Sequence, residues 1–384
     1  MNFIIKTTGK CNLRCRYCSL GDKSEGADMS IATLCLCFDK IVEFLARNNE
    51  RKCAIIFHGG EPTTLSADFY RTAIEYTRLR YAEYEFDWKI QTNGTLINEG
   101  YISLFKDYDF SVGISIDGTR DSHDRLRIRQ DGTGTYDVIT SNIERLRTNN
   151  VRCAVLLVQN ALMKDSPGGV LGWFTANDLD IRINPIIACG EAANNSALLL
   201  DKGDYARFLI EMFRLAAEAQ AEIAIRPVSE MLSAVINGTC MSECTFSDKC
   251  CKAFMCITEN GDIYPCGRFS DLSAMRIGNI KAISLIEAYE ADMMNSLRER
   301  KSTALPEECI ECNYINLCFG GCPAEAMAQG GDFRGKSCFC EDYKLLYQYL
   351  HTEGLELVEK KLKERRAQLE KLLLCNNGER SDEI

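Results

Sequence analysis

The chain has 384 residues, 46% hydrophobic and 26% charged, which is the composition of a soluble globular protein with two or three domains. Its formal net charge of −10, without a long basic run, argues against nucleic acid as a partner, and it has no run of about 18 apolar residues that would predict a membrane span. The first residues lack the apolar core of a secretory signal, so we predict a cytoplasmic protein, in which the 21 cysteines indicate metal sites rather than disulfides.

The first half of the chain alternates short apolar runs with segments of helical periodicity. Strands are predicted at residues 3–5, 53–57, 88–91, 110–116, 153–158 and 181–187, and helices at 29–47, 67–81, 136–149 and 205–219. This alternation is typical of a parallel sheet with helices outside it, and six such units would form an open or partial barrel. Barrel enzymes place their chemistry at the C-terminal ends of the strands, where polar or glycine-rich clusters recur in this sequence.

Three cysteines follow the first predicted strand: Cys11, Cys15 and Cys18, separated by three and two residues. Thiolates are the usual ligands of iron–sulfur clusters, so these three can bind three irons of a four-iron cluster. The fourth iron then stays open to a small molecule, as a catalytic metal keeps one position free. A zinc knuckle is the alternative, but zinc usually takes four ligands, and no His or fourth Cys follows closely.

Polar segments follow the next strands. They are His58-Gly59-Gly60-Glu61-Pro62, Gln91-Thr92-Asn93-Gly94 and Ser115-Ile116-Asp117-Gly118. Glycine permits a ligand to approach the backbone closely, and Glu61 can accept a hydrogen bond from an ammonium group. His58 could act as a general acid or base, or could simply end its strand. Turn capping is the alternative role of Gln91 and Ser115, and a solvated basic face is the alternative for Arg127, which lies among several arginines.

From Cys240 the alternation stops, and cysteine and glycine dominate as far as Cys340. The spacings are Cys251-x9-Gly261-x4-Cys266 and then Cys309-x2-Cys312-x5-Cys318, followed by Cys322, Cys338 and Cys340. Eight thiolates can hold two four-iron clusters, and structural zinc sites are the alternative because zinc also binds sets of four thiolates. Residues 345–374 predict an amphipathic helix, and we expect the residues after 375 to be disordered.

The three-cysteine loop resembles the signature of the radical S-adenosylmethionine (SAM) enzymes, and Gly59-Gly60-Glu61-Pro62 resembles their Gly-Gly-Glu-Pro motif. The cysteine-rich region, with Gly278-Asn279-Ile280 at its middle, resembles the SPASM domain, which carries two auxiliary clusters. The resemblance implies an α/β fold. Its expected parts are a partial (β/α)6 TIM-like barrel at 1–225, a connecting helix at 226–238, a small Cys-rich SPASM domain at 239–345, and a C-terminal helix with a disordered tail at 346–384.

The resemblance also implies the cofactors, SAM and three [4Fe–4S] clusters, and their ligands. The SAM-binding cluster would take Cys11, Cys15 and Cys18. Auxiliary cluster I would take Cys244, Cys251, Cys266 and Cys322, with Cys250 as the alternative to Cys251 and Cys240 as the alternative to Cys244. Auxiliary cluster II would take Cys309, Cys312, Cys318 and Cys340, with Cys338 as the alternative to Cys340. The expected SAM contacts are Gly59, Gly60, Glu61, Pro62, Gln91, Asn93, Ser115 and Arg127.

The resemblance is strongest to anaerobic sulfatase maturases, which oxidise a Cys or Ser side chain of a protein to formylglycine. Those enzymes resemble one another in an Asp directly after the cysteine of a Tyr-Pro-Cys segment, which is proposed to take the substrate proton. In this chain Tyr264-Pro265-Cys266 is followed by Gly267, which cannot be a base. We therefore expect a maturase of ribosomally made peptides (RiPPs) that forms a thioether or carbon–carbon crosslink, with sulfatase maturation as the alternative.

Such an oxidoreductase would act on a peptide or protein substrate and receive electrons from a flavodoxin- or ferredoxin-type donor. Because Cys11 lies so near the first residue, we expect no N-terminal leader-binding module of the kind that many peptide maturases carry. The hypothesis from another class is a multi-cluster iron–sulfur protein that only transfers electrons. The sequence does not identify a catalytic base.

Overall fold

The computed structural model describes residues 1–21, 26–219, 221–238, 244–328 and 331–378. In this part of the chain, ten strands form one sheet in the order β10-β9-β8-β1-β2-β3-β4-β5-β6-β7. The strands are β1 (Asn2–Thr8), β2 (Lys52–Gly59), β3 (Glu85–Thr92), β4 (Ser111–Ser115), β5 (Arg152–Gln159), β6 (Ile181–Pro185), β7 (Ile225–Arg226), β8 (Phe254–Ile257), β9 (Asp262–Tyr264) and β10 (Gly278–Asn279). Strands β1 to β7 pair in parallel, which confirms the predicted α/β architecture.

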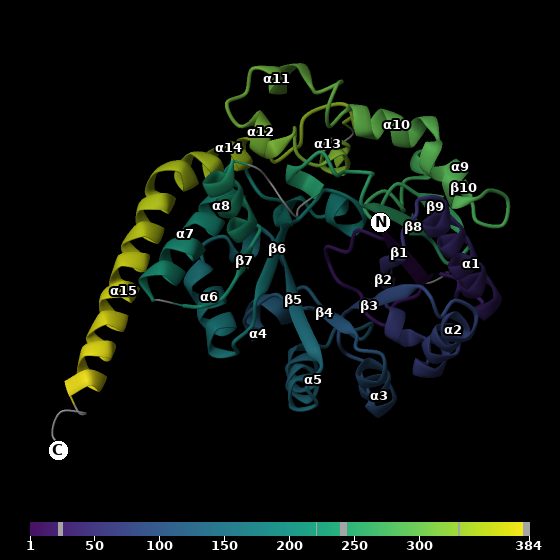
Figure 1. Ribbon diagram of the computed structural model, residues 1–384, viewed down its shortest axis with the longest axis horizontal. Coiled ribbons are helices and arrows are strands. Elements are labelled where there is room, and N and C mark those ends of the chain that lie inside the picture. The colour runs from purple at the N-terminus through teal and green to yellow at the C-terminus, as the bar shows by residue number, and fades with distance from the viewer. Residues whose placement is uncertain (22–25, 220, 239–243, 329–330, 379–384) are drawn as a thin grey trace.

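Helices lie along the outer side of this curved sheet, and the elements of the second half gather over one end of it (Figure 1). The helices of the first half are α1 (Ile31–Arg47), α2 (Ala67–Arg80), α3 (Glu99–Asp107), α4 (Arg120–Asp124), α5 (Tyr136–Thr148), α6 (Pro167–Ala176), α7 (Asp204–Glu218) and α8 (Val228–Asn237). Those of the second half are α9 (Leu285–Glu290), α10 (Asp292–Glu299), α11 (Glu307–Ile310), α12 (Ile315–Cys318), α13 (Pro323–Ala326), α14 (Cys340–Tyr349) and α15 (Leu355–Gly378).

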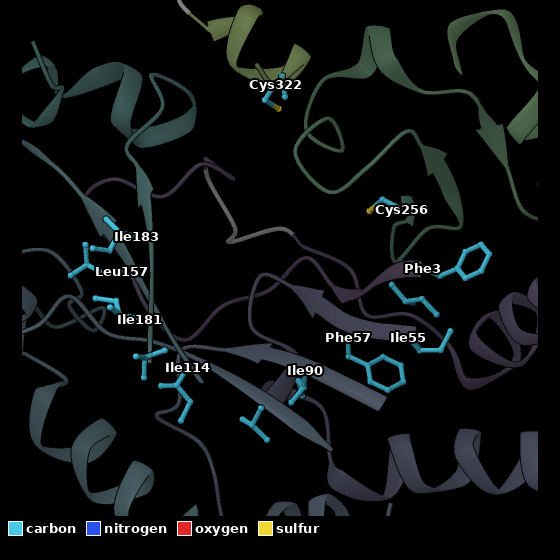
Figure 2. Packing of buried hydrophobic residues seen from close by; sticks show 14 of the residues in the cluster. Phe3, Ile55, Phe57, Ile90, Ile114, Leu157, Ile181, Ile183, Cys256 and Cys322 are labelled. Carbon is cyan, nitrogen blue, oxygen red and sulfur yellow. The ribbon is translucent and has the colours of Figure 1, made fainter. Parts of the chain in front are cut away.

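The core lies between the sheet and its helices. Successive side chains of a strand point to opposite faces, so one set of alternating residues meets the helices. Phe3, Ile55, Ile90 and Ile114 belong to that set, and each is at most 2% exposed (Figure 2). By the same alternation, intervening side chains such as Lys6 point toward the barrel interior. The strands therefore pack apolar side chains against the helices on one face and direct polar side chains such as Lys6 toward the barrel interior on the other.

Short strands of the cysteine-rich region extend the barrel sheet, which the sequence did not predict. Strand β8 pairs in parallel with β1, with Met255 opposite Phe3, and β8, β9 and β10 then pair antiparallel. This pairing fixes the cysteine-rich region against the first barrel strand through backbone hydrogen bonds. The loops of that region are consequently held near the C-terminal ends of the barrel strands.

The C-terminal segment departs from the predicted single helix. A short π-helical turn at Leu350–Gly354 separates α14 from α15. Helix α15 runs as far as Gly378, beyond the predicted end at residue 374, and the rest of the tail for which we expect disorder lies outside the described residues. No helix in the described part of the chain is long and apolar enough to cross a membrane.

Candidate functional site

The loop with the three cysteines follows β1 and lies against the segment after α4. Backbone bonds of 2.8 Å from Arg14 N to Ile128 O and 2.9 Å from Arg16 N to Leu126 O hold the two together. Cys15 is buried, whereas Cys11 and Cys18 are half-buried. The loop is therefore anchored on both sides of Cys15, and its other two thiols lie closer to the solvent.

Two glycines let the end of β2 approach this loop. Gly59 has a φ of +144°, and a Cβ atom there would lie 2.3 Å from Thr8 O. A Cβ atom on Gly60 would lie 2.1 Å from Lys10 O. The backbone then bonds across the gap, with Gly60 N donating to Thr8 O and Glu61 N donating to Lys10 O, each at 2.8 Å. Only glycine fits these positions, because any larger residue would force the strand end and the cluster loop apart.

The Glu61 carboxylate is used inside the protein. Its Oε1 accepts from Thr63 N at 2.9 Å and Thr92 Oγ1 at 2.6 Å, and its Oε2 accepts from Asn93 N at 2.6 Å. Burial raises the pKa of this carboxyl, and these hydrogen bonds act in the opposite direction. The side chain thus joins the ends of β2 and β3, which leaves the backbone of this segment as the part that can meet a ligand.

The predicted polar residues of β3 and β4 are neighbours. Gln91 Nε2 donates to Ser115 Oγ at 3.1 Å. Gly113 makes room for this pair, since a Cβ atom there would lie 2.2 Å from Gln91 Oε1. Asn93 turns instead to the cluster loop, where its Nδ2 donates to Asn12 Oδ1 at 2.9 Å. Gln91 and Ser115 therefore form one polar surface in the barrel, while Asn93 positions the loop.

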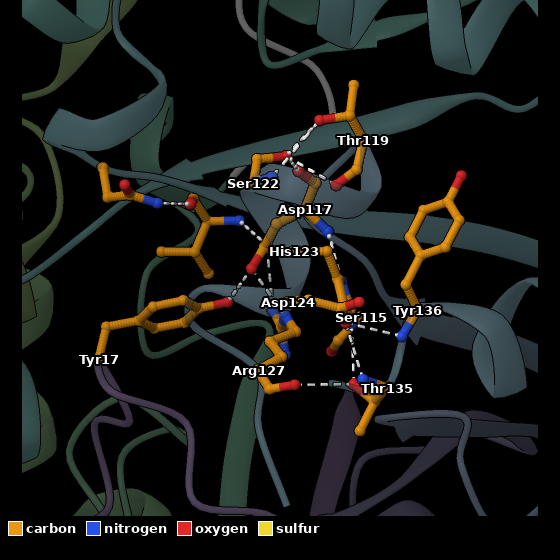
Figure 3. A network of polar contacts seen from close by, with 12 residues as sticks. Tyr17, Ser115, Asp117, Thr119, Ser122, His123, Asp124, Arg127, Thr135 and Tyr136 are labelled. Atoms are coloured by element: carbon orange, nitrogen blue, oxygen red, sulfur yellow. Dashed lines mark hydrogen bonds and ion pairs between the residues drawn. The ribbon is translucent and has the colours of Figure 1, made fainter. Parts of the chain in front are cut away.

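Arg127 belongs to a buried network (Figure 3). Its Nε donates to Asp117 Oδ2 at 2.9 Å, and Tyr17 Oη donates to the same oxygen at 2.6 Å. Asp117 is 0% exposed and Arg127 6% exposed. The network ties the cluster loop, through Tyr17, to the end of β4. Two of the guanidinium nitrogens are engaged with Asp117, so a bidentate contact to SAM would compete with this pair.

Two of the chain's three histidines lie near these strand ends. His123 Nδ1 accepts from Asp117 N at 3.2 Å, and its Nε2 lies 2.9 Å from Thr135 Oγ1. Burial lowers the pKa of His123 to about 4. Burial, and then Lys6, lower the pKa of His58 to about 4 as well, and its Nδ1 accepts from Gly59 N at 2.8 Å. Both imidazoles are therefore neutral acceptors near neutral pH.

Two further loops reach the same end of the barrel, one from the cysteine-rich region and one after β6. Lys6 Nζ lies 3.3 Å from Asp271 Oδ1 of the first loop, and Glu191 N of the second loop donates to Cys18 O at 2.8 Å. Burial raises the pKa of Cys189 in the second loop, as do the nearby Asp271 and Cys18. The sequence did not predict a role for Asp271 or Cys189. No local pattern distinguishes them, because the fold brings their two loops together.

Five thiols gather at the predicted site of auxiliary cluster I. Burial, and then Cys322, Cys250 and Cys244, raise the pKa of Cys266, so these four lie within electrostatic range of one another. The fifth is Cys251, whose Sγ lies 3.6 Å from that of Cys250. The structure brings together every predicted ligand of this set except Cys240, which lies outside the described residues.

The predicted thiols of auxiliary cluster II line one small cavity. They are Cys309, Cys312, Cys318 and Cys340. Gly320, Tyr314 and Lys344 complete part of its wall. Cys338 is exposed and is not part of the lining. A small space lined by four thiols fits a cluster with four thiolate ligands.

The charge around the thiols bears on the kind of group that they hold. The buried cations Arg300 and Lys301 lie at 0% exposure near both thiol groups. Buried positive charge of this kind fits an anionic group.

Known proteins share these features. Residues 5–160 match the family model of the radical SAM superfamily, and residues 250–313 match SPASM, an iron–sulfur cluster-binding domain. The cysteine-type anaerobic sulfatase-maturating enzyme of Clostridium novyi is 29% identical over 360 residues, which cover 91% of this chain and 94% of that enzyme.

Two solved structures resemble the fold. Native anSMEcpe with bound AdoMet has a TM-score of 0.80 and 24% identity, over 94% of this chain and 99% of that one. Streptococcus suis SuiB bound to precursor peptide SuiA has a TM-score of 0.64 and 16% identity, over 88% of this chain and 75% of that one.

The fold and the two matched domains define an iron–sulfur enzyme built on a partial α/β barrel. The chain is a radical SAM enzyme, and its second half carries a SPASM domain. The prediction of SAM and iron–sulfur clusters as cofactors is thereby confirmed.

Proposed function

We propose that this enzyme oxidises a Cys or Ser side chain of a protein substrate to formylglycine, as anaerobic sulfatase-maturating enzymes do. The observation that carries the proposal is the likeness to the Clostridium novyi enzyme, which extends over more than nine-tenths of both chains. It supports the sulfatase-maturase alternative better than the peptide crosslinking that the sequence analysis favoured. Electrons for the reaction would come from a flavodoxin- or ferredoxin-type donor.

The cofactors would be held by the predicted ligands. Cys11, Cys15 and Cys18 hold the SAM-binding cluster, and the cavity thiols Cys309, Cys312, Cys318 and Cys340 hold auxiliary cluster II. Cluster I takes Cys244, Cys266, Cys322 and one of the adjacent pair Cys250 and Cys251. When bound, SAM and the three clusters supply a radical that abstracts hydrogen and a sink for one electron.

The chain's own residues orient SAM against the first cluster. The backbone of Gly59, Gly60 and Pro62 would hold the methionine part of SAM, since the Glu61 side chain is engaged with β3. Gln91 and Ser115 offer paired polar groups to the sugar or the methionine. Asn93 and Arg127 act on SAM through the loop that they position, by their bonds to Asn12 and to the Asp117–Tyr17 pair.

Formylglycine formation removes one hydrogen atom, one electron and one proton from the side chain. For Ser this gives the aldehyde directly, whereas for Cys it gives a thioaldehyde that water converts to the aldehyde with release of hydrogen sulfide. Gly267 cannot take the proton, and a Cβ atom there would meet Ile4 at 3.3 Å. Asp271 is the proposed acceptor. It lies in the same loop, it is 39% exposed, and it interacts with Lys6 and with Cys189 beside the SAM-cluster loop. Lys6 balances the carboxylate charge.

The test uses anaerobically reconstituted protein with SAM and dithionite. Synthetic peptides that carry one Cys or Ser should yield 5′-deoxyadenosine and an aldehyde that reacts with a hydrazine reagent, as seen by mass spectrometry. Asp271→Asn should lower aldehyde formation, whereas Asp248→Asn, which changes an exposed carboxylate of the same domain, should not.

The second candidate function is peptide crosslinking, and Gly267 is the observation that favours it. A crosslinked peptide loses two hydrogens and carries no aldehyde, so the same experiment separates the two functions. SAM cleavage with no change in any Cys or Ser peptide would exclude formylglycine formation.

A further inference from the structure

Two adjacent cations lie buried in the SPASM domain, just after α10. Arg300 and Lys301 are both 0% exposed. Moving a charge out of water is costly unless it is paired and hydrogen-bonded, and the effective penalty is several kcal/mol for each ion. Two such charges side by side also repel each other. A nearby negative charge is therefore needed to offset the cost of burying both cations.

Arg300 contacts backbone carbonyls. Its Nη2 donates to Gly320 O at 2.6 Å and to Gly335 O at 2.7 Å, and its Nε donates to Phe333 O at 3.0 Å. Its Nη1 donates to the carbonyls of Phe319 and Gly321. These bonds satisfy the guanidinium hydrogens but supply no negative charge.

Three of these carbonyls belong to the segment that joins the two sets of thiols. Phe319, Gly320 and Gly321 connect Cys318 of the cluster II set to Cys322 of the cluster I set. Their φ angles are +50°, +72° and +70°, a left-handed conformation that turns the segment around the guanidinium. A Cβ atom on Gly320 would lie 2.8 Å from Arg300 Nη1. Glycine there permits the close contact.

Lys301 makes the corresponding contact on the cluster I side. Its Nζ donates to Gly321 O at 2.9 Å and to Thr245 O at 2.8 Å, and Thr245 follows Cys244. The ammonium therefore joins the first and the last segments of the cluster I set. Arg300 and Lys301 share Gly321 O as an acceptor, so the two cations form one connected unit.

The groups that can balance this charge are thiolates of both sets. Cys309 and Cys318 of the cluster II set and Cys322 and Cys250 of the cluster I set all act on Arg300. Cys250, Cys318 and Cys322 act on Lys301. In the parts of the chain that the structure describes, no carboxylate forms an ion pair with either residue.

We propose that Arg300 and Lys301 form a cationic bridge shared by the two auxiliary clusters, which raises the reduction potentials of both. The proposal rests on the ligand sets of the proposed function. Four thiolates make each cluster a net anion, and reduction adds one further negative charge. A fixed cation in a low-dielectric interior stabilises the reduced form more than the oxidised form. Because the bridge touches both sets, one side chain tunes two clusters.

The test is a redox titration of the reconstituted holoenzyme, followed by electron paramagnetic resonance. Lys301→Gln removes one charge and keeps a donor for the carbonyls. In both auxiliary clusters it should lower the ratio of reduced to oxidised cluster at a fixed potential by about tenfold, which corresponds to about 59 mV for one electron. The SAM-binding cluster should not shift. Lys281→Gln removes an exposed lysine of the same domain and should leave all three clusters unchanged.

Lys301→Arg keeps the positive charge but changes the packing. It should keep the reduction potentials of both auxiliary clusters near those of the unmodified protein. If Lys301→Gln loses auxiliary iron while Lys301→Arg retains it, the charge is needed even to hold the clusters, and the proposal stands. It is overturned if Lys301→Gln shifts one auxiliary cluster or neither, or if Lys301→Arg shifts or loses them to the same extent. None of these readings depends on the substrate, so failure of the proposed reaction would leave the test intact.

Discussion

The barrel and the SPASM domain treat buried positive charge differently. In the barrel, Arg127 pairs with Asp117 of the barrel itself, and Lys6 pairs with Asp271 of the cysteine-rich region. In the SPASM domain, Arg300 and Lys301 are as deeply buried but contact backbone carbonyls. Side-chain carboxylates thus balance the buried cations of the barrel. For Arg300 and Lys301, the balance is left to a group that the polypeptide does not provide.

This difference indicates that the two regions depend on their cofactors to different degrees. Buried ion pairs in the barrel fix geometry whether or not SAM and its cluster are present. Buried cations without carboxylates disfavour the folded SPASM domain until anionic clusters fill it. We therefore expect the barrel to fold without its cofactors and the SPASM domain to fold fully only around its clusters.

Removal of the clusters should give the largest effect and test this comparison directly. After chelation of iron, residues 244–328 should lose hydrogen-exchange protection worth about 3 kcal/mol or more, or roughly a hundredfold in rate, because Arg300 and Lys301 lose their counter-charge. Strands β2 to β5 should keep most of their protection. Hydrogen exchange with mass spectrometry measures both regions in one sample. Equal loss of protection in both regions would contradict the comparison.

Asp117→Asn should leave a buried cation of the barrel without a carboxylate partner, as Arg300 and Lys301 are in the SPASM domain. Arg127 would lose its carboxylate and stay buried, at a cost of about 3–5 kcal/mol in the free energy of unfolding of the cluster-free protein. Urea unfolding monitored by circular dichroism gives this value. Asp137→Asn breaks the exposed pair with Arg120 and should have little effect. Similar effects of the two variants would mean that the buried pair is not important for stability.

Local sequence patterns predicted the barrel because each of its strands and helices has its own pattern of apolar residues. The apolar run 53–57 lies in β2, and the segment of helical periodicity 29–47 corresponds to α1. The pairing of β8 with β1 was not predicted. Strand β8 has four residues and pairs with a strand some 250 positions away, for which no local periodicity exists.

The candidate site shows the same division. The resemblance to the SPASM domain predicted the two sets of thiols that the structure brings together, although Cys244 and Cys322 of one set lie far apart in the sequence. Which partner each polar side chain binds was harder to predict. Glu61 and Arg127 were predicted to contact SAM, but in the structure Glu61 binds the end of β3 and Arg127 binds Asp117. Arg300 and Lys301 belong to a charged stretch that, without the fold, does not differ from a solvated helix end.

His123 should give the acid sensitivity of the barrel network. Its pKa is about 4 in the folded protein, against about 6.5 for an unperturbed histidine, so the unfolded chain binds the extra proton first as the pH falls. Its stabilising contribution is complete above pH 6.5 and is lost as the pH falls through 4, by up to about 3 kcal/mol. His123→Asn should flatten this part of the stability curve, whereas His351→Asn, at an exposed position, should not. A curve unchanged in His123→Asn would show that other groups cause the acid loss.

The smallest effect is expected where the SPASM domain has a thiol to spare. The SAM-cluster loop offers three cysteines for three irons, so Cys15→Ala should lose that cluster and all SAM cleavage.

The cluster I site has five thiols for four positions, and Cys250 and Cys251 lie side by side with sulfurs 3.6 Å apart. Because the two sulfurs are this close, we expect either one to be able to replace the other as a ligand. Cys250→Ala and Cys251→Ala should therefore each keep about twelve irons per chain, whereas the double variant should lose about four, as Cys322→Ala does. Iron and sulfide analysis of the four variants decides the matter. If one single variant loses as much iron as Cys322→Ala, that cysteine is the sole ligand, and the SPASM domain is as strictly specified as the cluster loop of the barrel.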